Sequence, residues 1–228
     1  MGNELHNEEM EELHRIAVAG AKVPPRYFLW RNPFEARGEA PARLLAAADA
    51  WVDGYEPGKA QGWALANKTV GCGKSHLAAY MAQGVLRRFP WGSDPRVRVR
   101  WQNVPDLFMR IRATYDPERA VESEREVVVD MTEPDLLILD DMGVERPKVW
   151  VLEILYSILN DRGNRNKTTC FTSNYTAKAL EKRLAFGSDG KDGDPDLAAR
   201  IMSRMCDNLM RWPAEFPNVD YRKAKRGT

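Results

Sequence analysis

The sequence has few cysteines, no long hydrophobic run and almost no net charge. Cys72, Cys170 and Cys206 lack the paired spacing of a disulfide framework, which favours a reducing compartment, and we expect a cytoplasmic protein. No apolar run is long enough to span a membrane, and the acidic start does not resemble a signal peptide. Lys and Arg total 34 against 33 Asp and Glu, so the formal net charge is +1. Nucleic-acid binding would therefore need a local basic patch.

The pattern of apolar residues predicts an α/β domain. The chain has 228 residues, of which 43% are hydrophobic, so it can bury a sizeable core. The predicted strands are 63–66, 96–101, 136–139 and 168–172, and the predicted helices are 41–55, 75–89, 104–114 and 147–160. Because strands and helices alternate, we expect a parallel sheet with helices on both faces. Two prolines should keep residues 23–27 extended.

A further short helix is predicted ahead of this domain, at residues 7–19, with Asn7 as its N-cap. The apolar residues that recur at helical spacing along one face are Met10, Leu13, Ile16 and Ala17. Such a stripe most often packs on its own domain, although it also suits the docking of a partner. We therefore divide the chain into an N-terminal helical segment, residues 1–22, and a main domain, residues 23–228.

A glycine-rich turn with Gly73-Lys74-Ser75 lies between a predicted strand and a predicted helix, which is the context of a P-loop. Glycines let main-chain N–H groups close around phosphate oxygens, and the next helix directs its positive end toward them. Lys74 would bind the β and γ oxygens of ATP, and Ser75 would give its hydroxyl to Mg²⁺. Lys68 stands where the motif has its first glycine. This departure leaves open a module that binds ATP without hydrolysing it.

Two carboxylates follow the apolar strand at 136–139. Parallel strands end at the edge where α/β proteins bind ligands, so these side chains should lie beside the P-loop. We expect Asp140 to hold Mg²⁺, mostly through water, and Asp141 to orient or deprotonate the attacking water. At the end of the next apolar strand, Asn174 is a candidate to hold that water or to sense the γ-phosphate.

These three elements in this order resemble the DnaC/IstB-like AAA+ ATPases, which include replicative helicase loaders and transposition helpers. The residues that carry the resemblance are 24–27 (Pro-Pro-Arg-Tyr), 71–78, 136–143, 172–174, 200–205 and 220–222. The resemblance covers residues 23–222, nearly the whole chain. The Gly-Lys-Ser tripeptide is unspecific alone, but the ordered set is strong.

The resemblance implies an AAA+ parallel sheet of strand order 5-1-4-3-2, with ATP and Mg²⁺ as ligands. It also implies a homo-oligomer in the ATP-bound state, in which each subunit completes the ATP site of its neighbour. The implied nucleotide-binding residues are Gly71, Cys72, Gly73, Lys74, Ser75 and His76. On this template Arg204 is the expected arginine finger, and Arg200 is the second choice. The implied catalytic residues are Lys74, Asp141, Asn174 and Arg204.

By this resemblance the chain would be an ATPase that loads a replicative helicase onto single-stranded DNA, with hydrolysis dependent on an oligomer or partner. Loaders generally carry a sizeable helicase-binding domain ahead of the ATPase, whereas only residues 1–22 precede it here. The alternatives are a transposition helper that acts on a transposase and a weakly hydrolysing or non-hydrolysing ATP-binding regulator. A small-molecule kinase fits less well, because the acidic pair suits attack by water.

A basic strip after the P-loop helix is the candidate for DNA contact. The strand at 96–101 alternates arginines with apolar residues, and in the implied order it is an edge strand whose arginine face lies in solvent. Arg110 and Arg112, on the next helix, could follow a single-stranded backbone without reading bases. Phe108 and Tyr115 are the nearby aromatic candidates for stacking.

Overall fold

The computed structural model describes residues 2–28, 39–90, 92–115, 120–145, 148–186, 193–207, 209 and 216–221, with the main chain alone at 2–7 and 39–41. The strands are β1 (Ala64–Ala66), β2 (Val99–Asn103), β3 (Leu136–Met142) and β4 (Thr168–Ser173). The α-helices are α1 (Gly2–Gly20), α2 (Glu39–Gly54), α3 (Lys74–Arg88), α4 (Val104–Ala113), α5 (Glu124–Thr132), α6 (Val149–Asn164), α7 (Ala177–Ala185) and α8 (Pro195–Cys206). A short 3₁₀ helix, η1 (Pro25–Tyr27), follows α1.

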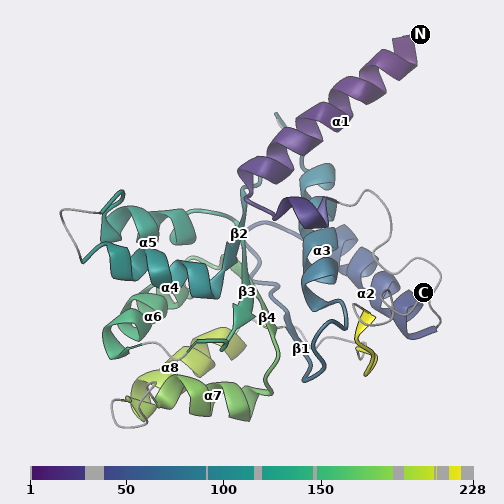
Figure 1. The fold of residues 1–228 in the computed structure, drawn as a ribbon. Coiled ribbons are helices and arrows are strands. Elements are labelled where there is room, and N and C mark those ends of the chain that lie inside the picture. Colours follow the sequence, from purple (N-terminus) through teal and green to yellow (C-terminus); the bar gives the residue numbers. More distant parts are fainter. Residues whose placement is uncertain are drawn as a thin grey trace.

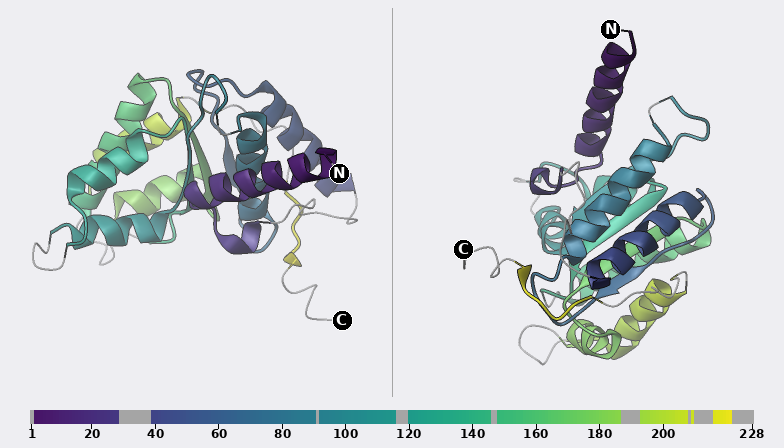
Figure 2. Two further views of the ribbon diagram at one scale, coloured as in Figure 1. Left: turned by 90° about the horizontal axis from the view of Figure 1, so that it is seen from above. Right: turned by 90° about the vertical axis from the view of Figure 1, so that its right-hand side faces the viewer.

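The strands run parallel in the order β1-β4-β3-β2, with α1 to α3 on one face of the sheet and α4 to α8 on the other (Figures 1 and 2). This confirms the predicted fold class and the 1-4-3-2 part of the predicted order. Beyond β1, Leu209 makes an isolated parallel bridge with Gly62, at the edge where a fifth strand would pair. Its neighbours 208 and 210–215 lie outside the described residues.

The continuous apolar run of β3 reflects burial on both faces of the sheet. Leu136 and Ile138 pack in the core shared with α2 and α3, whereas Leu137 and Leu139 pack in the core shared with α4 to α8. Alternate residues of a strand point to opposite faces, so a strand between two helical layers has no polar face. Where the apolar run stops, at Asp140, the strand reaches the edge of the sheet that carries the candidate site.

The N-terminal helix is longer than predicted, so Asn7 lies inside α1 and does not cap it. Val18 is buried and Ala17 packs against the core, which anchors the last turns of the helix. The rest of the apolar stripe faces solvent, with exposed fractions of 38%, 42% and 58% for Met10, Leu13 and Ile16. The N-terminal part of α1 projects beyond the body of the domain (Figure 1). No helix among the described residues is both long and apolar enough to cross a membrane.

The predicted extended segment and the predicted solvent-facing arginines need correction. Residues 25–27 form η1, because Pro24 is extended and Pro25 occupies the first helical position, where a proline fits. β2 is the predicted edge strand, but Arg100 on its arginine face is only 4% exposed and pairs with Asp130 at 2.5 Å. A solvated face was expected because helix α5, which supplies Asp130, was not predicted from the sequence.

A fully buried arginine, Arg162, joins the ends of three elements on the α4–α8 side. Its guanidinium donates to the carbonyl oxygens of Met131 at 2.9 Å, Pro134 at 2.7 Å and Thr168 at 2.5 Å. Its Nε donates to Thr169 Oγ1 at 2.8 Å. Burial lowers the pKa of Arg162 to about 10, so the side chain stays charged at neutral pH. Main-chain carbonyl oxygens therefore make the direct contacts to this charge, and the nearby charge of Asp135 also stabilises it.

Replacing Arg162 with leucine should lower the free energy of unfolding by about 3–5 kcal/mol, because it leaves several buried carbonyl oxygens without donors. Urea unfolding measures this loss. Arg165→Leu is the matched control at the end of the same helix, since Arg165 makes only half-exposed ion pairs with Glu133 and Asp161. Its loss should stay within about 1 kcal/mol. Equal effects of the two variants would contradict the prediction.

Candidate nucleotide site

The loop between β1 and α3 has the backbone of a phosphate-binding loop. Gly71 and Gly73 have φ angles of 77° and 101°, a region that favours glycine, and α3 starts directly after them at Lys74. The described non-glycine residues with positive φ are Lys22, Asp141 and Asn166, so Lys68 is not among them. The missing glycine of the motif therefore costs no backbone strain at Lys68, whose side chain is exposed.

The amine of Lys74 lies within this loop. Nζ donates to the carbonyl oxygens of Asn67 at 3.1 Å and Thr69 at 3.0 Å, and the residue is only 7% exposed. A bound phosphate would offer the same amine a charged acceptor. Cys72 is buried in the core, so its main chain rather than its thiol is available to a ligand. The ring of His76 is exposed on the first turn of α3.

Ser75 and Asp140 meet as the sequence predicted. The Ser75 hydroxyl donates to Asp140 Oδ1 at 2.8 Å, and the Thr172 hydroxyl donates to the same oxygen at 2.5 Å. Burial raises the pKa of Asp140 to about 6, against the effect of the Thr172 hydrogen bond. A hydroxyl and a carboxylate from two rigid elements are hard oxygen donors of the kind that Mg²⁺ takes beside a nucleotide. The residues present therefore fit the predicted metal.

The two candidates for handling water also lie at this edge of the sheet. Asp141 has a φ of 63°, its N–H donates to Thr172 Oγ1 at 3.0 Å, and its Oδ2 accepts from Asn103 Nδ2 at 3.4 Å. A non-glycine residue in this region is strained, and such strain clusters at functional sites. Asn174 is half-buried directly after β4, and β3 pairs with β4 up to Ser173. Thr172 thus bridges Asp140 and Asp141, a role that sequence reasoning missed.

Arg26 and Tyr27 of η1 are further residues that sequence reasoning did not place in the site. The Tyr27 ring packs edge-on against His76 with centroids 4.7 Å apart, and the Arg26 guanidinium carbon lies 4.7 Å from the Tyr27 centroid. Burial, and then the charge of Asp140, raise the pKa of Tyr27. The charge of Arg26 in turn offsets part of the effect of burial, which raises the pKa of Asp140. The Pro-Pro-Arg-Tyr motif was the available signal.

The C-terminal segment packs on the outside of the phosphate loop. The Tyr221 N–H donates to Gly71 O at 3.1 Å, and Thr69 Oγ1 donates to Asn218 Oδ1 at 3.2 Å. Asn67 Nδ2 donates to Phe216 O at 3.3 Å. The motif at residues 220–222 therefore supports the loop from outside. Arg222 itself lies outside the described residues.

The predicted arginine finger does not join the phosphate loop of its own chain. Helix α8 lies on the other face of the sheet from α3 (Figure 1). Arg204 donates to Asn160 Oδ1 and to Asp207 Oδ2, both at 2.9 Å, and its side chain is 38% exposed. Arg200 is exposed one turn earlier on the same helix.

The residues considered for DNA contact differ in how accessible they are. Arg110 is held by Glu122 at 2.7 Å and Asp130 at 2.8 Å, whereas Arg112 makes one half-exposed ion pair, with Glu145 at 3.1 Å. Phe108 is 1% exposed, so the expectation that it stacks on bases is wrong. Tyr115 is 60% exposed, and its ring centroid lies 4.4 Å from that of Trp150, a residue that the sequence did not single out.

Comparison with solved structures identifies the fold. The crystal structure of DnaI matches with a TM-score of 0.62 and 26% identity, over 85% of this chain and 93% of that one. The crystal structure of the DnaC helicase loader matches with a TM-score of 0.61 and 21% identity, over 82% and 98%. The chain has the fold of the DnaC-like AAA+ proteins. This confirms the resemblance that the ordered motifs of the sequence predicted.

The same AAA+ fold occurs in the replication initiator DnaA bound to AMPPCP and single-stranded DNA, with a TM-score of 0.59 and 18% identity over 90% of this chain and 56% of that one. In sequence, the chain is 27% identical to the uncharacterized protein YdaV of Escherichia coli K12. The match extends over 142 residues, or 62% of this chain. That match covers 48% of YdaV, so the chain spans about half the length of this curated relative. No protein-family model matches the chain.

Proposed function

We propose that this DnaC-like AAA+ chain binds ATP with Mg²⁺ at the P-loop and hydrolyses it in an assembly of several copies. The observation that carries the proposal is the contact of Ser75 with Asp140, 2.8 Å apart, at the start of the helix that also holds Lys74. Nucleotide binding is also supported by DnaA, a protein of the same fold whose structure contains AMPPCP. The non-hydrolysing alternative was motivated by Lys68, and the backbone at Lys68 shows no strain from the missing glycine.

Each residue then has a definite task. The N–H groups of Gly71, Cys72 and Gly73 bind phosphate oxygens, and Lys74 exchanges its loop carbonyls for the β and γ oxygens. Bound Mg²⁺ neutralises charge that develops on the phosphates. Thr172 orients Asp140 for this ion.

The attacking water is handled by residues at the ends of β3 and β4. Asp141 orients it or accepts its proton, and Asn174 holds it in line with the γ-phosphate. Arg204 of a neighbouring copy completes the charge around that phosphate.

We further propose that the hydrolysis cycle serves to load a replicative helicase onto single-stranded DNA. The similarity to DnaI and to the DnaC helicase loader supports this over a transposition helper. Residues 1–22 form the docking segment, since Leu13 and Ile16 are exposed on a helix that projects from the domain (Figure 1).

Single-stranded DNA would run along α4. The half-exposed Arg112 binds its phosphates, and the exposed ring of Tyr115 stacks on a base. Arg110 contributes only where DNA displaces it from Glu122 and Asp130.

The direct test is a nucleotide titration of the purified protein with and without Mg²⁺, followed by phosphate release at increasing protein concentration. Binding of ATP that depends on Mg²⁺, with a rate per subunit that rises with concentration, is the expected result. No binding of ATP in either condition would refute the proposal.

Replacing Asp141 with asparagine should leave ATP affinity nearly unchanged and slow hydrolysis about 10²–10⁴-fold, because it removes the base and spares Asp140. Phosphate release under saturating ATP measures the rate. A normal rate would make Asp141 a structural carboxylate that only accepts from Asn103.

Replacing Arg26 with alanine should weaken ATP binding about tenfold or more and leave ADP binding nearly unchanged, because Arg26 lies over the Tyr27 ring, its charge acts on Asp140, and it would reach the terminal phosphate. Arg26→Lys should keep part of this preference. Arg15→Ala is the control, since Arg15 lies on α1 and pairs with Glu12. Equal losses of affinity for ATP and for ADP would instead indicate that Arg26 acts only by packing against Tyr27.

A further inference from the structure

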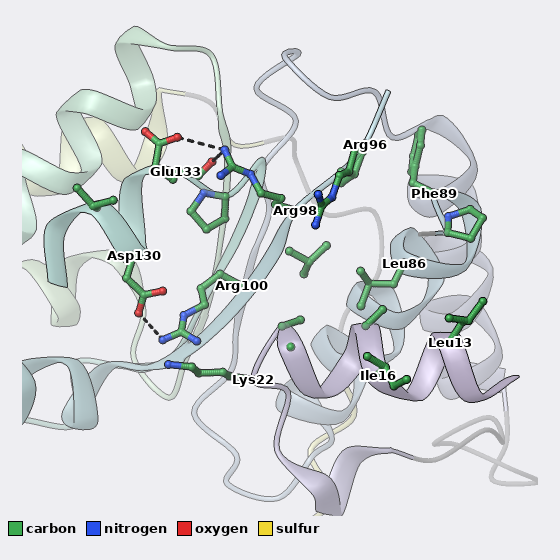
Figure 3. A pocket seen from close by; sticks show the side chains of 18 residues that line it. Leu13, Ile16, Lys22, Leu86, Phe89, Arg96, Arg98, Arg100, Asp130 and Glu133 are labelled. Carbon is green, nitrogen blue, oxygen red and sulfur yellow. Dashed lines mark hydrogen bonds and ion pairs between the residues drawn. The ribbon is translucent and has the colours of Figure 1, made fainter. Parts of the chain in front are cut away.

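A second concave surface lies at the outer edge of the sheet, away from the phosphate loop. It is a groove of about 640 Å³ between α1, the C-terminal end of α3, β2 with the residues before it, and the end of α5 (Figure 3). The phosphate loop lies at the N-terminal end of α3, and this groove at its C-terminal end. The 15 residues of α3 span roughly 20 Å, so the two sites are separate.

The floor of the groove is an open strand edge. Main-chain groups alternate between the two sides of a strand, and Arg98 O accepts from Leu136 N on the β3 side. On the outer side, Trp101 N–H donates to Ala21 O at 2.7 Å, where the chain leaving α1 covers the edge. The main-chain groups of Val97 and Val99 face the same outer side and have no hydrogen-bond partner there among the described residues. An edge of this kind is a template for another strand.

The two walls of the groove differ in chemistry, as Figure 3 shows. One wall is apolar, formed by Leu13 and Ile16 of α1 with Leu86 and Phe89 at the end of α3. Leu13 and Ile16 are 42% and 58% exposed, so this wall is open to a ligand.

The opposite wall is charged and has more cations than anions. Arg98 pairs with Glu133 at 3.1 Å and Arg100 with Asp130 at 2.5 Å. Lys22 adds a further positive charge that lines the same groove (Figure 3), and the pKa of Lys22 is lowered first by burial and then by Arg100. This wall therefore favours acidic side chains.

We propose that this groove binds an extended segment of a partner protein, which adds to β2 as a strand and alternates apolar with acidic residues. Its main chain would pair with Val97 and Val99. Successive side chains of a strand point to opposite faces, so one set would meet Leu13 and Ile16 and the other would meet Lys22, Arg98 and Arg100. A helix would leave the edge groups unpaired, because its own main chain is already bonded internally. The inference rests on the docking role proposed for residues 1–22 and is independent of ATP hydrolysis.

The test is a selection of random nine-residue displayed peptides on the full-length protein, followed by synthesis of the enriched peptides as probes. The enriched sequences should alternate apolar and acidic residues. Probe binding should fall more than about tenfold in Ile16→Asp, which places a charge against the apolar residues of the peptide, and in Arg98→Glu, which places a negative charge against its acidic residues. Met10→Asp and Arg15→Glu are the matched controls, exposed on α1 but outside the groove, and they should bind normally. Thermal melts check that each variant is folded.

Hydrogen exchange of single amides distinguishes strand addition from other modes of binding. The bound peptide should slow exchange at Val97 and Val99 and leave Arg100, already bonded within the sheet, unchanged. No enriched peptide, or enriched peptides that are basic, would overturn the inference. Groove binding without protection of Val97 and Val99 would also overturn strand addition, while leaving the docking role of residues 1–22 intact. Loss of binding in the controls as well as the groove variants would place the site elsewhere on α1.

Discussion

Lys74→Ala is expected to abolish measurable ATP binding. The Lys74 amine lies inside the phosphate loop, 3.1 and 3.0 Å from two of its carbonyl oxygens, where a β or γ oxygen would take over the contact. Removing one partner of such a desolvated charge contact costs about 2–5 kcal/mol, and a loss of about 4 kcal/mol already moves a micromolar site into the millimolar range. Calorimetric titration of ATP with Mg²⁺ measures the loss.

Lys68→Ala is the control for this variant, because Lys68 belongs to the same loop but its side chain is exposed. Its ATP affinity should stay close to that of the wild type. If Lys74→Ala binds ATP normally and Lys68→Ala does not, then Lys68 supplies the charge. If neither variant is affected, ATP binds elsewhere on the molecule.

Arg204→Ala should lower the rate of ATP hydrolysis in the assembled state roughly a thousandfold or more, the effect of arginine fingers in other P-loop enzymes. Helix α8, which carries Arg204, lies on the other face of the sheet from α3 (Figure 1). Arg204 would therefore act on the ATP of a neighbouring copy. To do so it must leave Asn160 and Asp207, and its side chain is 38% exposed, which makes that release easy. ATP affinity of the dilute protein should not change.

Mixing Arg204→Ala with Lys74→Ala should recover part of the activity, since each variant spares one half of a shared site. Phosphate release measured against protein concentration provides the readout. Arg200→Ala separates the two candidates on α8. If this variant loses activity and Arg204→Ala does not, then Arg200, one turn earlier, is the arginine finger. A rate per subunit that stays flat with concentration, and equal in both variants, would argue for a monomeric enzyme.

Much of the fold could be predicted because its signals are local. The apolar runs of β3 and β4 and the helix after Lys74 depend on periodicity along the chain, which only a few neighbouring residues set. The meeting of Ser75 with Asp140, 65 positions apart, was also predictable, because parallel strands end at one edge of the sheet. What the pattern did not supply were α5 and α7, whose nine residues each are short for a periodic signal, and with α5 the Asp130 that pairs with both Arg100 and Arg110.

The sequence by itself determined that this chain has a P-loop sheet and predicted which residues would bind phosphate and Mg²⁺, since spacing and residue type carry that information. Only the tertiary structure decided the surroundings of those residues. It showed that the loop position held by Lys68 does not require a glycine. It also showed that Thr172 bridges Asp140 and Asp141, and that Arg26 lies near the site. It also decided that β2 keeps an open edge beside an apolar helix. The reason is that burial and charge pairing depend on residues that are distant in sequence, and folding alone brings them into contact.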